Sequence, residues 1–578
     1  MVAATMIPRL LLFLLTTLAL QAAQKSPEEL QLEQDNEDYI HTPIGFSKPR
    51  EPSLLQDENA ANLVIRVIDK DSGNSTPCRM NVVGPDGMFY QPAPSVLSDY
   101  ALTGIWPMAK GNRRGMGPFR YFGRFFYSDG QSEVKVPAGV TRVEVWKGFE
   151  YRPVTLTLNL EQRETRSVEL ELERTLDAAR FGYFGGDSHI HIERTNAAND
   201  ELIFTLTKAE DIRYASILCY NQNVSEYEGH PMKQGLPQKF GFGKASLRGQ
   251  DIYQIMSGQE YRSRFLGHIK VFLLNRIVKQ GESFSPDHYI FAERLDSIRK
   301  EGGYTIWAHG GYGKEIYANV PFGDVDGVEL LQFGNYRGIG LEGWYAMLNT
   351  GYRPALVGAS DYPPCRKLAD CRTYIHHEGR REPRFPEWIE AMGEGRSFVT
   401  TGPVLLLEVD GAKPGESLSF NGERTVRIRA RVNSEVAPVT RLQILIGGNT
   451  LKEIQVPAET GQHAWVELDA DVTLNQSTWI AARATGEAPT GSPNAEAHTN
   501  PVYIYVNGRA PFVEASHQFL VEQLGAETER QANRKDFPGK DRLVGYFRAS
   551  LEKLKGLKET GGMTREEALS LIPNSRKN

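Results

Sequence analysis

Two stretches of the chain alternate apolar and polar residues with the period of a half-buried strand. Segments such as TRVEVWKG, in the first stretch, and TVRIRARV, in the second, place every second side chain on the same face. Turns rich in Gly, Pro and Asp separate these segments. The pattern predicts an antiparallel β-sandwich domain at 60–178 and a second β-sandwich domain at 402–508.

Between these stretches, residues 179–401 alternate strand-like and helix-like patterns. Apolar residues recur on one helical face over 199–212, with Asn199 as the expected cap, and over 286–300. A last short helix is expected in FPEWIEAMGEGR. This alternation favours an α/β unit with parallel strands. Amphipathic patterns over 509–578 predict a helical C-terminal tail, which completes a multidomain chain of α/β and all-β parts.

The N-terminal residues have the pattern of an export signal. Arg9 precedes an apolar run over 10–20, and the small residues Ala22 and Ala23 follow it. We therefore expect a signal peptide at 1–23, a polar N-terminal tail at 24–59, and a secreted or periplasmic protein. The alternative is an N-terminal membrane anchor that stays attached. No second long apolar run follows, so no further membrane span is expected.

Charge and cysteine content exclude some classes of protein. The net charge is −6, which gives no reason to expect nucleic-acid binding or attraction to an anionic membrane. The four cysteines lack the spacing of a zinc finger. In an oxidising compartment, Cys365 and Cys371 form either a disulfide or two free thiols, and the sequence leaves both open. The oligomeric state is also left open.

Six potential metal ligands lie at the ends of five strand-like runs. Because the ends of parallel strands meet at one side of an α/β sheet, we expect these side chains to converge. Imidazoles and carboxylates together suit a catalytic divalent metal. The six residues are His189, His191, Glu260, His268, His309 and Asp361. His189 and His191 are two residues apart, which places both rings on the same side of an extended segment.

Five further residues are candidates for supporting roles. Asp187 is expected to hold an imidazole N–H, with metal ligation and proton transfer as other possible roles. Glu329 either orients a ligand or caps a turn. Tyr220, Asn221 and Lys244 are candidates for substrate binding. Lys244 belongs to a glycine-rich, basic segment over 229–250, which is interpreted as a flexible cationic lid or as a solvated loop.

The motifs GDSHIH, GQE-x7-GHI, WAHGG and GASD, in this order and followed by IEAMGEGRSFVTTGPVL, resemble the CehA/McbA family of metallohydrolases. This family belongs to the PHP (polymerase and histidinol phosphatase) superfamily. The resemblance covers about 182–410. It implies a PHP-like distorted β/α barrel that binds two or three divalent metals and hydrolyses ester, carbamate or phosphoester bonds.

The chain departs from the fullest PHP pattern at two positions. Cys219 and Tyr220 stand where an Asp-His pair is usual, and Asp361-Tyr362-Pro363 replaces a final Asp-x-His. Both differences fall on ligands of the third metal. The resemblance therefore implies two ions, Zn, Mn or Fe. One set of ligands would be His189, His191, Glu260 and Asp361, and the other would be Glu260, His268 and His309.

These observations predict an exported metal-dependent hydrolase that acts on a small ester-type substrate. Asp361 or Asp187 is the candidate to accept the proton of the attacking water. One alternative is an inactive PHP-like scaffold whose β domains bind a polymer or a cell-surface ligand. Another is a carbohydrate-cleaving enzyme that uses two carboxylates without metal, although the motifs contain histidines instead of a carboxylate pair.

Overall fold

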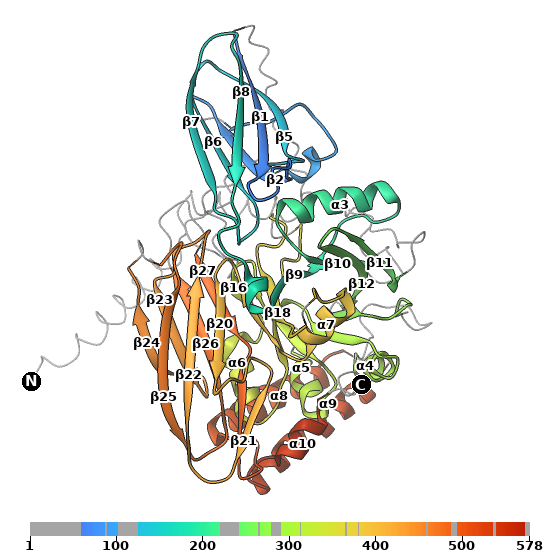
Figure 1. Cartoon of the computed structure of the whole chain (residues 1–578). Helices are drawn as coiled ribbons and strands as arrows, with labels where there is room; N and C mark the ends of the chain where they lie inside the picture. The colour runs from blue at the N-terminus through green and yellow to red at the C-terminus, as the bar shows by residue number, and fades with distance from the viewer. Residues whose placement is uncertain are drawn as a thin grey trace, which may run out of the picture.

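The computed structural model describes residues 59–86, 89–101, 125–219, 242–263, 266–278, 291–311, 314–363, 367–379, 381–457, 461–486, 494–535 and 539–572. The expected signal peptide and nearly all of the expected polar tail lie outside these residues. The described chain is multidomain and rich in strands, and it contains several sheets. An N-terminal β domain projects from a larger body in which helices and strands are combined (Figure 1).

The N-terminal domain consists of two sheets around a common core. The first sheet has the order β5 (Gln131–Val136), β1 (Ala61–Asp69) and β8 (Thr165–Leu172). The second has the order β3 (Phe89–Tyr90), β2 (Cys78–Val83), β6 (Gly139–Trp146) and β7 (Val154–Leu160), with β4 (Phe126–Ser128) beside β2. Leu63 and Val134 of the first sheet share a core with Met80 and Val143 of the second, as the alternation predicts. The prediction of purely antiparallel pairing is wrong at one ladder, because β1 and β8 are parallel.

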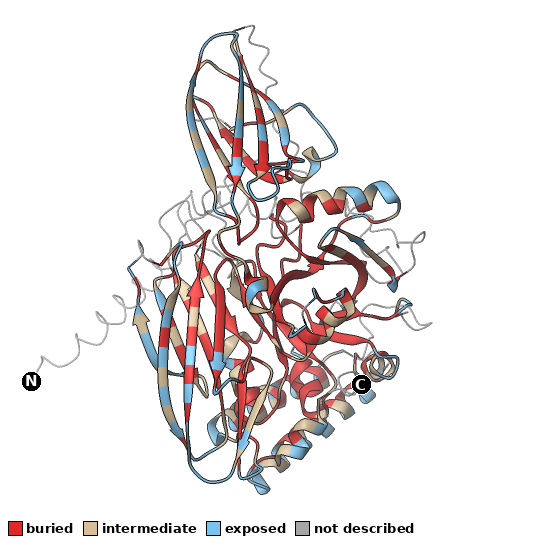
Figure 2. Cartoon of the chain, in the orientation of Figure 1, coloured by how far each residue is buried: buried red, intermediate tan, exposed pale blue. Residues whose placement is uncertain are grey.

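The central unit is built on a mixed sheet in which parallel strands predominate. The strands that share one direction are β9 (Tyr183–Ile190), β10 (Tyr214–Cys219), β12 (Tyr253–Ser263), β14 (Tyr304–Trp307), β15 (Gly327–Gln332) and β17 (Ala355–Gly358). The antiparallel strands are β11 (Gly243–Gln250), β13 (Gly267–Phe272), β16 (Asn335–Tyr336) and β18 (Arg372–His376). Most of the parallel strands are buried along their whole described length (Figure 2), which is typical of parallel strands covered on both faces.

Short helices connect and cover these strands, as the alternating pattern predicts. They are α3 (Ala197–Ala209), α4 (Ala292–Lys300), α5 (Ile316–Asn319), α6 (Gly340–Asn349) and α7 (Phe385–Gly393). The cap of α3 is Asn196, whose side chain accepts the N–H of Asn199, so the predicted cap lies three residues too late. On α7, Trp388 packs with Phe184 and Tyr304, near the beginnings of β9 and β14. The opposite ends of these strands carry the candidate ligands.

The C-terminal β domain shares a sheet with the central unit. Its first sheet has the order β20 (Val404–Val409), β22 (Arg424–Asn433) and β25 (Val466–Leu474). The second contains β21 (Ser417–Phe420), β23 (Arg441–Ile446), β24 (Asn449–Gln455), β26 (Thr478–Gly486), β27 (Ala495–Thr499) and β28 (Val502–Val506). Strand β19 (Ser397–Thr400) pairs with β18 on one side and with β27 on the other. The predicted boundary at 401–402 lies in the connection between β19 and β20, but the sheet that contains β19 continues from the central unit into the C-terminal domain.

The C-terminal segment is helical, but it is not a separate tail. It forms α8 (Glu514–Ala532), α9 (Lys540–Glu559) and α10 (Arg565–Ser570), drawn in red in Figure 1. Leu524 of α8 and Phe547 of α9 belong to the same core as Trp307 and Trp344 of the central unit. Burial of these large apolar side chains is the main source of stabilisation between the helices and the central unit.

Candidate metal centre

The candidate ligands lie together at one side of the central sheet. His189 is near the end of β9 and His191 follows that strand, while His309 follows β14. His268 is the second residue of β13. Because β13 is antiparallel to its neighbours, its beginning lies where the parallel strands finish. Glu260 differs from the expectation of a strand end, since it lies within β12, which continues to Ser263.

A short backbone contact brings Asp361 to the two histidines of β9. Tyr362 forms an isolated parallel bridge with Ile190. The N–H of Tyr362 donates to the carbonyl of His189 at 3.2 Å, and the N–H of His191 donates to the carbonyl of Tyr362 at 2.8 Å. The segment after β17 is thereby attached to β9, and Asp361 lies beside the two imidazoles.

Glu260 is the carboxylate that the two groups of ligands share. One of its oxygens, Oε1, lies 2.8 Å from His268 Nδ1 and 3.0 Å from His309 Nε2, and these two nitrogens are 3.1 Å apart. The other oxygen, Oε2, lies 3.3 Å from His191 Nε2. A carboxylate with imidazoles beside both oxygens has the arrangement needed to bridge two cations.

The second group consists of His189, His191, Glu260 and Asp361. Asp361 Oδ1 lies 3.3 Å from His189 Nε2 and 3.5 Å from His191 Nε2, and Glu260 Oε1 lies 3.4 Å from His189 Nε2. Ligand atoms placed tetrahedrally at 2.0–2.2 Å from an ion are roughly 3.3–3.6 Å apart. Each of these pairs therefore has the spacing of neighbouring ligands on a tetrahedral ion. The ligand atoms of His189, His191 and Glu260 lie within 4.8 Å of one another, as do those of His189, His309 and Asp361.

Two buried atoms at this point lack a hydrogen-bond partner among the residues that the structure describes. They are His189 Nε2 and Asp361 Oδ1, and they face each other. A buried polar atom without a partner costs about 1–3 kcal/mol, so native proteins rarely leave one without a reason. A bound cation would satisfy both atoms together. Groups of His, Glu and Asp able to hold a metal ion are thus present in this chain.

Comparisons with protein-family models, curated proteins and solved structures found no match to this chain. The chemistry of the centre is therefore inferred from its own residues. In the described part of the chain, no helix is long and apolar enough to cross a membrane.

Three of the four imidazoles are held by an acceptor on the nitrogen that faces away from Glu260. Nδ1 of His189 lies 2.9 Å from Glu329 Oε2, and Nδ1 of His191 lies 3.1 Å from the carbonyl oxygen of Leu218. Nδ1 of His309 lies 3.1 Å from Gln332 Oε1. Such outer partners fix the ring orientation and leave Nε2 to bind a metal. Of the two sequence-based alternatives for Glu329, its contact with His189 fits the orientation of a candidate ligand.

A buried lysine that was not identified from the sequence pairs with the carboxylate beside His189. Lys270 is fully buried, forms an ion pair with Glu329, and donates to the hydroxyl of Ser188 at 2.8 Å. Burial alone would raise the pKa of Glu329, but the charges of Lys270 and His189 outweigh it and lower that pKa. Glu329 therefore stays ionised and accepts from His189. A single lysine in the apolar run HIKVFLL was the signal that could have identified it.

Asp187 does not have the contact predicted for it. Its Oδ1 accepts the N–H of His189 at 3.0 Å and the N–H of Ser360 at 3.2 Å, and its Oδ2 accepts the Ser360 hydroxyl at 2.5 Å. The prediction that it holds an imidazole N–H is therefore wrong. The carboxylate instead joins the backbone of β9 to the segment before Asp361. Burial raises the pKa of Asp187 to about 6, although these hydrogen bonds oppose the shift.

Neighbouring carboxylates and burial shift the pKa values of two imidazoles in opposite directions. Burial by itself lowers the pKa of His189, but Glu329, Asp361 and Glu260 outweigh it and raise that pKa to about 9. Burial lowers the pKa of His268 to about 4. Only a neutral imidazole binds a metal, so binding at His189 would release a proton. Metal ions and protons compete at this part of the centre.

The residues predicted to bind substrate are not in the described cluster. Tyr220 and Asn221 lie outside the described residues. Lys244 is exposed on β11, where its charge acts on Glu390 of α7. The described end of the predicted lid, from Gly243 to Gln250, is thus a strand and not a flexible loop.

None of the cysteines that the structure describes belongs to this cluster. Cys219 is buried at the end of β10, and burial raises its pKa to about 12, which fits the expectation of a core residue. Cys371 is a free, buried thiol whose sulfur accepts the N–H of Gly334 at 3.1 Å. Cys365 lies outside the described residues. The free-thiol alternative is the one that fits Cys371.

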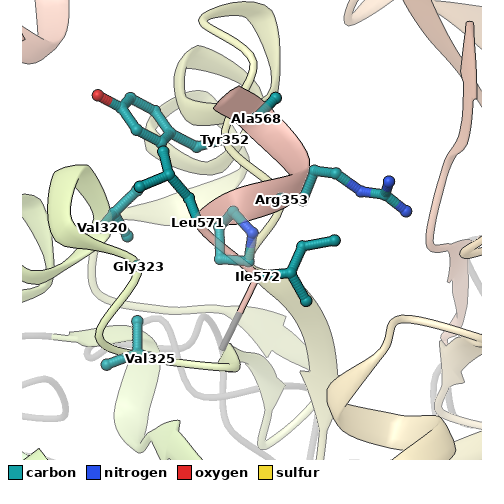
Figure 3. Close-up of a pocket in the computed structure, with 9 residues that line it drawn as sticks. Val320, Gly323, Val325, Tyr352, Arg353, Ala568, Leu571 and Ile572 are labelled. Carbon is teal, nitrogen blue, oxygen red and sulfur yellow. The ribbon is translucent and has the colours of Figure 1, made fainter. Parts of the chain in front are cut away.

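A small cavity lies elsewhere, where α10 meets the central unit (Figure 3). The residues that line it are Val320, Gly323, Val325, Tyr352, Arg353, Pro354, Ala568, Leu571 and Ile572. The guanidinium of Arg353 is held by the carbonyl of Gly415 at 2.7 Å and stacks on Tyr503 at 3.7 Å. None of the candidate ligands lines this cavity, so it is separate from the metal centre.

Proposed function

We propose that this chain is a metal-dependent hydrolase of the CehA/McbA type within the PHP superfamily. Its centre would hold two divalent ions, Zn, Mn or Fe, on a PHP-like barrel and cleave an ester, carbamate or phosphoester bond. The N-terminal sequence pattern supports export of the protein to the periplasm or the exterior. The observation that carries the proposal is the convergence of the buried, unpartnered atoms His189 Nε2 and Asp361 Oδ1 at the spacing of tetrahedral ligands.

Each residue of the cluster has a distinct part in this proposal. His189, His191, Glu260 and Asp361 would hold one ion, and Glu260, His268 and His309 would hold the other. When bound, such ions lower the pKa of water towards about 7 and polarise the bond to be cleaved. Asp361 is the candidate proton acceptor, since its Oδ2 lies 3.6 Å from His309 Nδ1 at the rim of the cluster. Water adds across the ester bond, and the leaving group takes up a proton.

Elemental analysis of the purified chain tests this proposal most directly. We expect about two equivalents of Zn, Mn or Fe per chain, the number that a two-metal hydrolytic site requires. A His189→Ala/His191→Ala double variant should lose most of this metal. A His463→Ala variant is the matched control, because His463 contacts Glu435 at 2.5 Å and belongs to none of the groups able to hold a metal.

A screen of aryl esters, carbamates and phosphoesters would follow on the metal-loaded protein. Activity that disappears in the double variant and persists in the control would support the hydrolase. A parent chain that holds almost no metal, even after reconstitution, would overturn it. That result would favour the inactive scaffold whose β domains bind a polymer or a surface ligand.

A further inference from the structure

The cluster has an accessible side and a closed side. The side chains of His189 and Glu260 are 0% exposed. Those of Asp361, His309 and His268 are 9%, 10% and 14% exposed. A substrate must therefore approach from the side of His268, His309 and Asp361.

Arg262 lies on this accessible side. It is two residues after Glu260 on β12 and is the cross-strand partner of His268 on β13, so all three side chains share one face of the sheet. Its Nε donates to Glu260 Oε2 at 2.6 Å, and its side chain is 12% exposed. The guanidinium is thereby fixed beside the shared carboxylate, at the mouth of the centre.

A second basic residue on the same face has a different position. Lys270 is the cross-strand partner of Glu260, is fully buried, and forms an ion pair with Glu329. Arg262 also pairs with a carboxylate, that of Glu260, but its side chain is 12% exposed and lies on the side by which a substrate enters. Of the two basic residues, Arg262 is therefore the one that can contact a substrate.

The charge of the centre favours an anion. Among the described residues, the carboxylates of Glu260, Glu329 and Asp361 face the cluster, and Arg262 and Lys270 pair with two of them. Two divalent ions would therefore leave the centre strongly positive. A positive, partly enclosed site concentrates anionic substrates, and a guanidinium matches the oxygens of a phosphoryl group in geometry and charge.

We propose that Arg262 is a specificity-determining residue that binds the phosphoryl oxygens of a phosphoester substrate beside the metal centre. This inference rests on the proposed function and narrows it to one of the three bond types. Neutral esters and carbamates offer no full negative charge to the guanidinium, so they gain less from this contact.

Calorimetry on the full chain separates this inference from the proposed function. Mn²⁺ is first titrated into the parent and into the Arg262→Gln, Arg262→Lys and Arg276→Gln variants, and inorganic phosphate is then titrated into each metal-loaded protein. Arg276 is the matched control, because it also pairs with a glutamate, Glu301, but is 45% exposed at a separate site. Hydrolysis of 4-nitrophenyl phosphate and of neutral 4-nitrophenyl acetate is measured alongside.

Arg262→Gln should bind Mn²⁺ at least as tightly as the parent, since it no longer places a cation beside Glu260. Its Kd for phosphate should rise roughly 10- to 100-fold, the loss expected for a charged hydrogen bond. Arg262→Lys should recover part of this affinity, and Arg276→Gln should match the parent. The kcat/KM for the phosphate ester should fall by at least ~10-fold more than that for the acetate.

Three results would contradict the inference, and they can be told apart. Equal phosphate affinity in Arg262→Gln and the parent, with Mn²⁺ bound to both, would overturn the role of Arg262 alone. Loss of Mn²⁺ from Arg262→Gln would also overturn it, because Arg262 would then act by positioning Glu260. A parent that binds no Mn²⁺ would overturn both the inference and the proposed function.

Discussion

Two buried clusters of charged residues in this chain differ in how their charges are satisfied. In the first, between the N-terminal domain and the central unit, Arg174 lies 3.1 Å from Glu150 and 2.8 Å from Asp211. The hydroxyl of Tyr253 donates to Asp211 at 2.9 Å, and the ring of Tyr151 lies 4.4 Å from the guanidinium. The central guanidinium thus has two carboxylate partners and an aromatic one.

The metal centre is satisfied only at its periphery. Glu329 is paired with Lys270, and Glu260 with Arg262. At its middle, His189 Nε2 and Asp361 Oδ1 face each other without a hydrogen bond to any described residue. Burial of charge alone therefore does not distinguish the two clusters. The convergence of unsatisfied atoms on one point does, and it is the basis of the proposed metal site.

Removal of Arg174 should have the largest effect on stability. Arg174→Met leaves two buried carboxylates without their shared partner, which costs about 3–5 kcal/mol in the free energy of unfolding. Urea unfolding followed by fluorescence would measure this loss. Metal content should stay at the parent level, because Arg174 belongs to none of the groups able to hold a metal. A free energy of unfolding within about 1 kcal/mol of that of the parent would contradict the structural role of this cluster.

Asp361→Asn should have a small effect on stability and a large effect on metal binding, the reverse of Arg174→Met. It removes a charged ligand atom that lacks a hydrogen-bond partner, so it should destabilise the metal-free protein by less than half as much as Arg174→Met. Its Mn²⁺ affinity should fall by at least ~100-fold, the upper range for loss of an outer partner of a ligand. Calorimetry and urea unfolding of the same samples give both values. Unchanged Mn²⁺ affinity would contradict the proposal that the unsatisfied atoms of this cluster bind a metal.

Lys270→Met tests the periphery of the metal centre. Loss of the ammonium removes the partner that keeps Glu329 ionised, and Glu329 in turn orients His189. We expect Mn²⁺ affinity to fall about 10- to 100-fold, as for other outer partners of metal ligands. A Glu329→Gln variant should show a similar loss. If Lys270→Met binds Mn²⁺ within about twofold of the parent, the lysine has no positioning role.

The smallest expected effect is on the pH dependence of stability, and it comes from Lys147. The charges of Asp211 and Arg174, in the first cluster, act on this residue. Burial lowers its pKa to about 8, although Asp211 opposes the shift. The unfolded chain, with a lysine pKa near 10.4, binds more protons than the folded chain between these two values. Stability contributed by this group therefore rises with pH above about 8, by at most roughly 1.4 kcal/mol per pH unit.

The measurement is urea unfolding at several pH values between pH 7.5 and about 10 for the parent and for Lys147→Met. The difference in stability between the two proteins should shift in favour of the parent as the pH rises. A difference that is constant over this range would show that Lys147 does not titrate there.

The sequence predicted the kinds of elements well and their connections poorly. Period-two alternation identified both β domains because one face of each strand is buried. It gave no information on pairing partners, so the parallel ladder of β1 with β8 was not foreseen. The continuity of the sheet through β19 and the packing of α8 on the central unit depend on contacts far apart in the chain.

The sequence identified the candidate ligands and one residue that contacts them, Glu329, but not Lys270 or Arg262. His189 and His191 are recognisable because their spacing places both rings on one side of a strand. The partner of His189, Glu329, is 140 residues away, and no local pattern links the two. Arg262 and Lys270 were missed although they alternate with Glu260 and His268, since facing residues become evident only when β12 and β13 are in register.

The sequence by itself therefore determined the chemical types available and the strands that carry them, because side-chain periodicity is a local property. Only the tertiary structure decided which atoms converge and which are satisfied. Asp187 illustrates the difference: the sequence predicted a contact with an imidazole, while the folded chain uses its carboxylate for the backbone of His189 and Ser360. Hydrogen bonding of a buried group depends on neighbours that the sequence does not place.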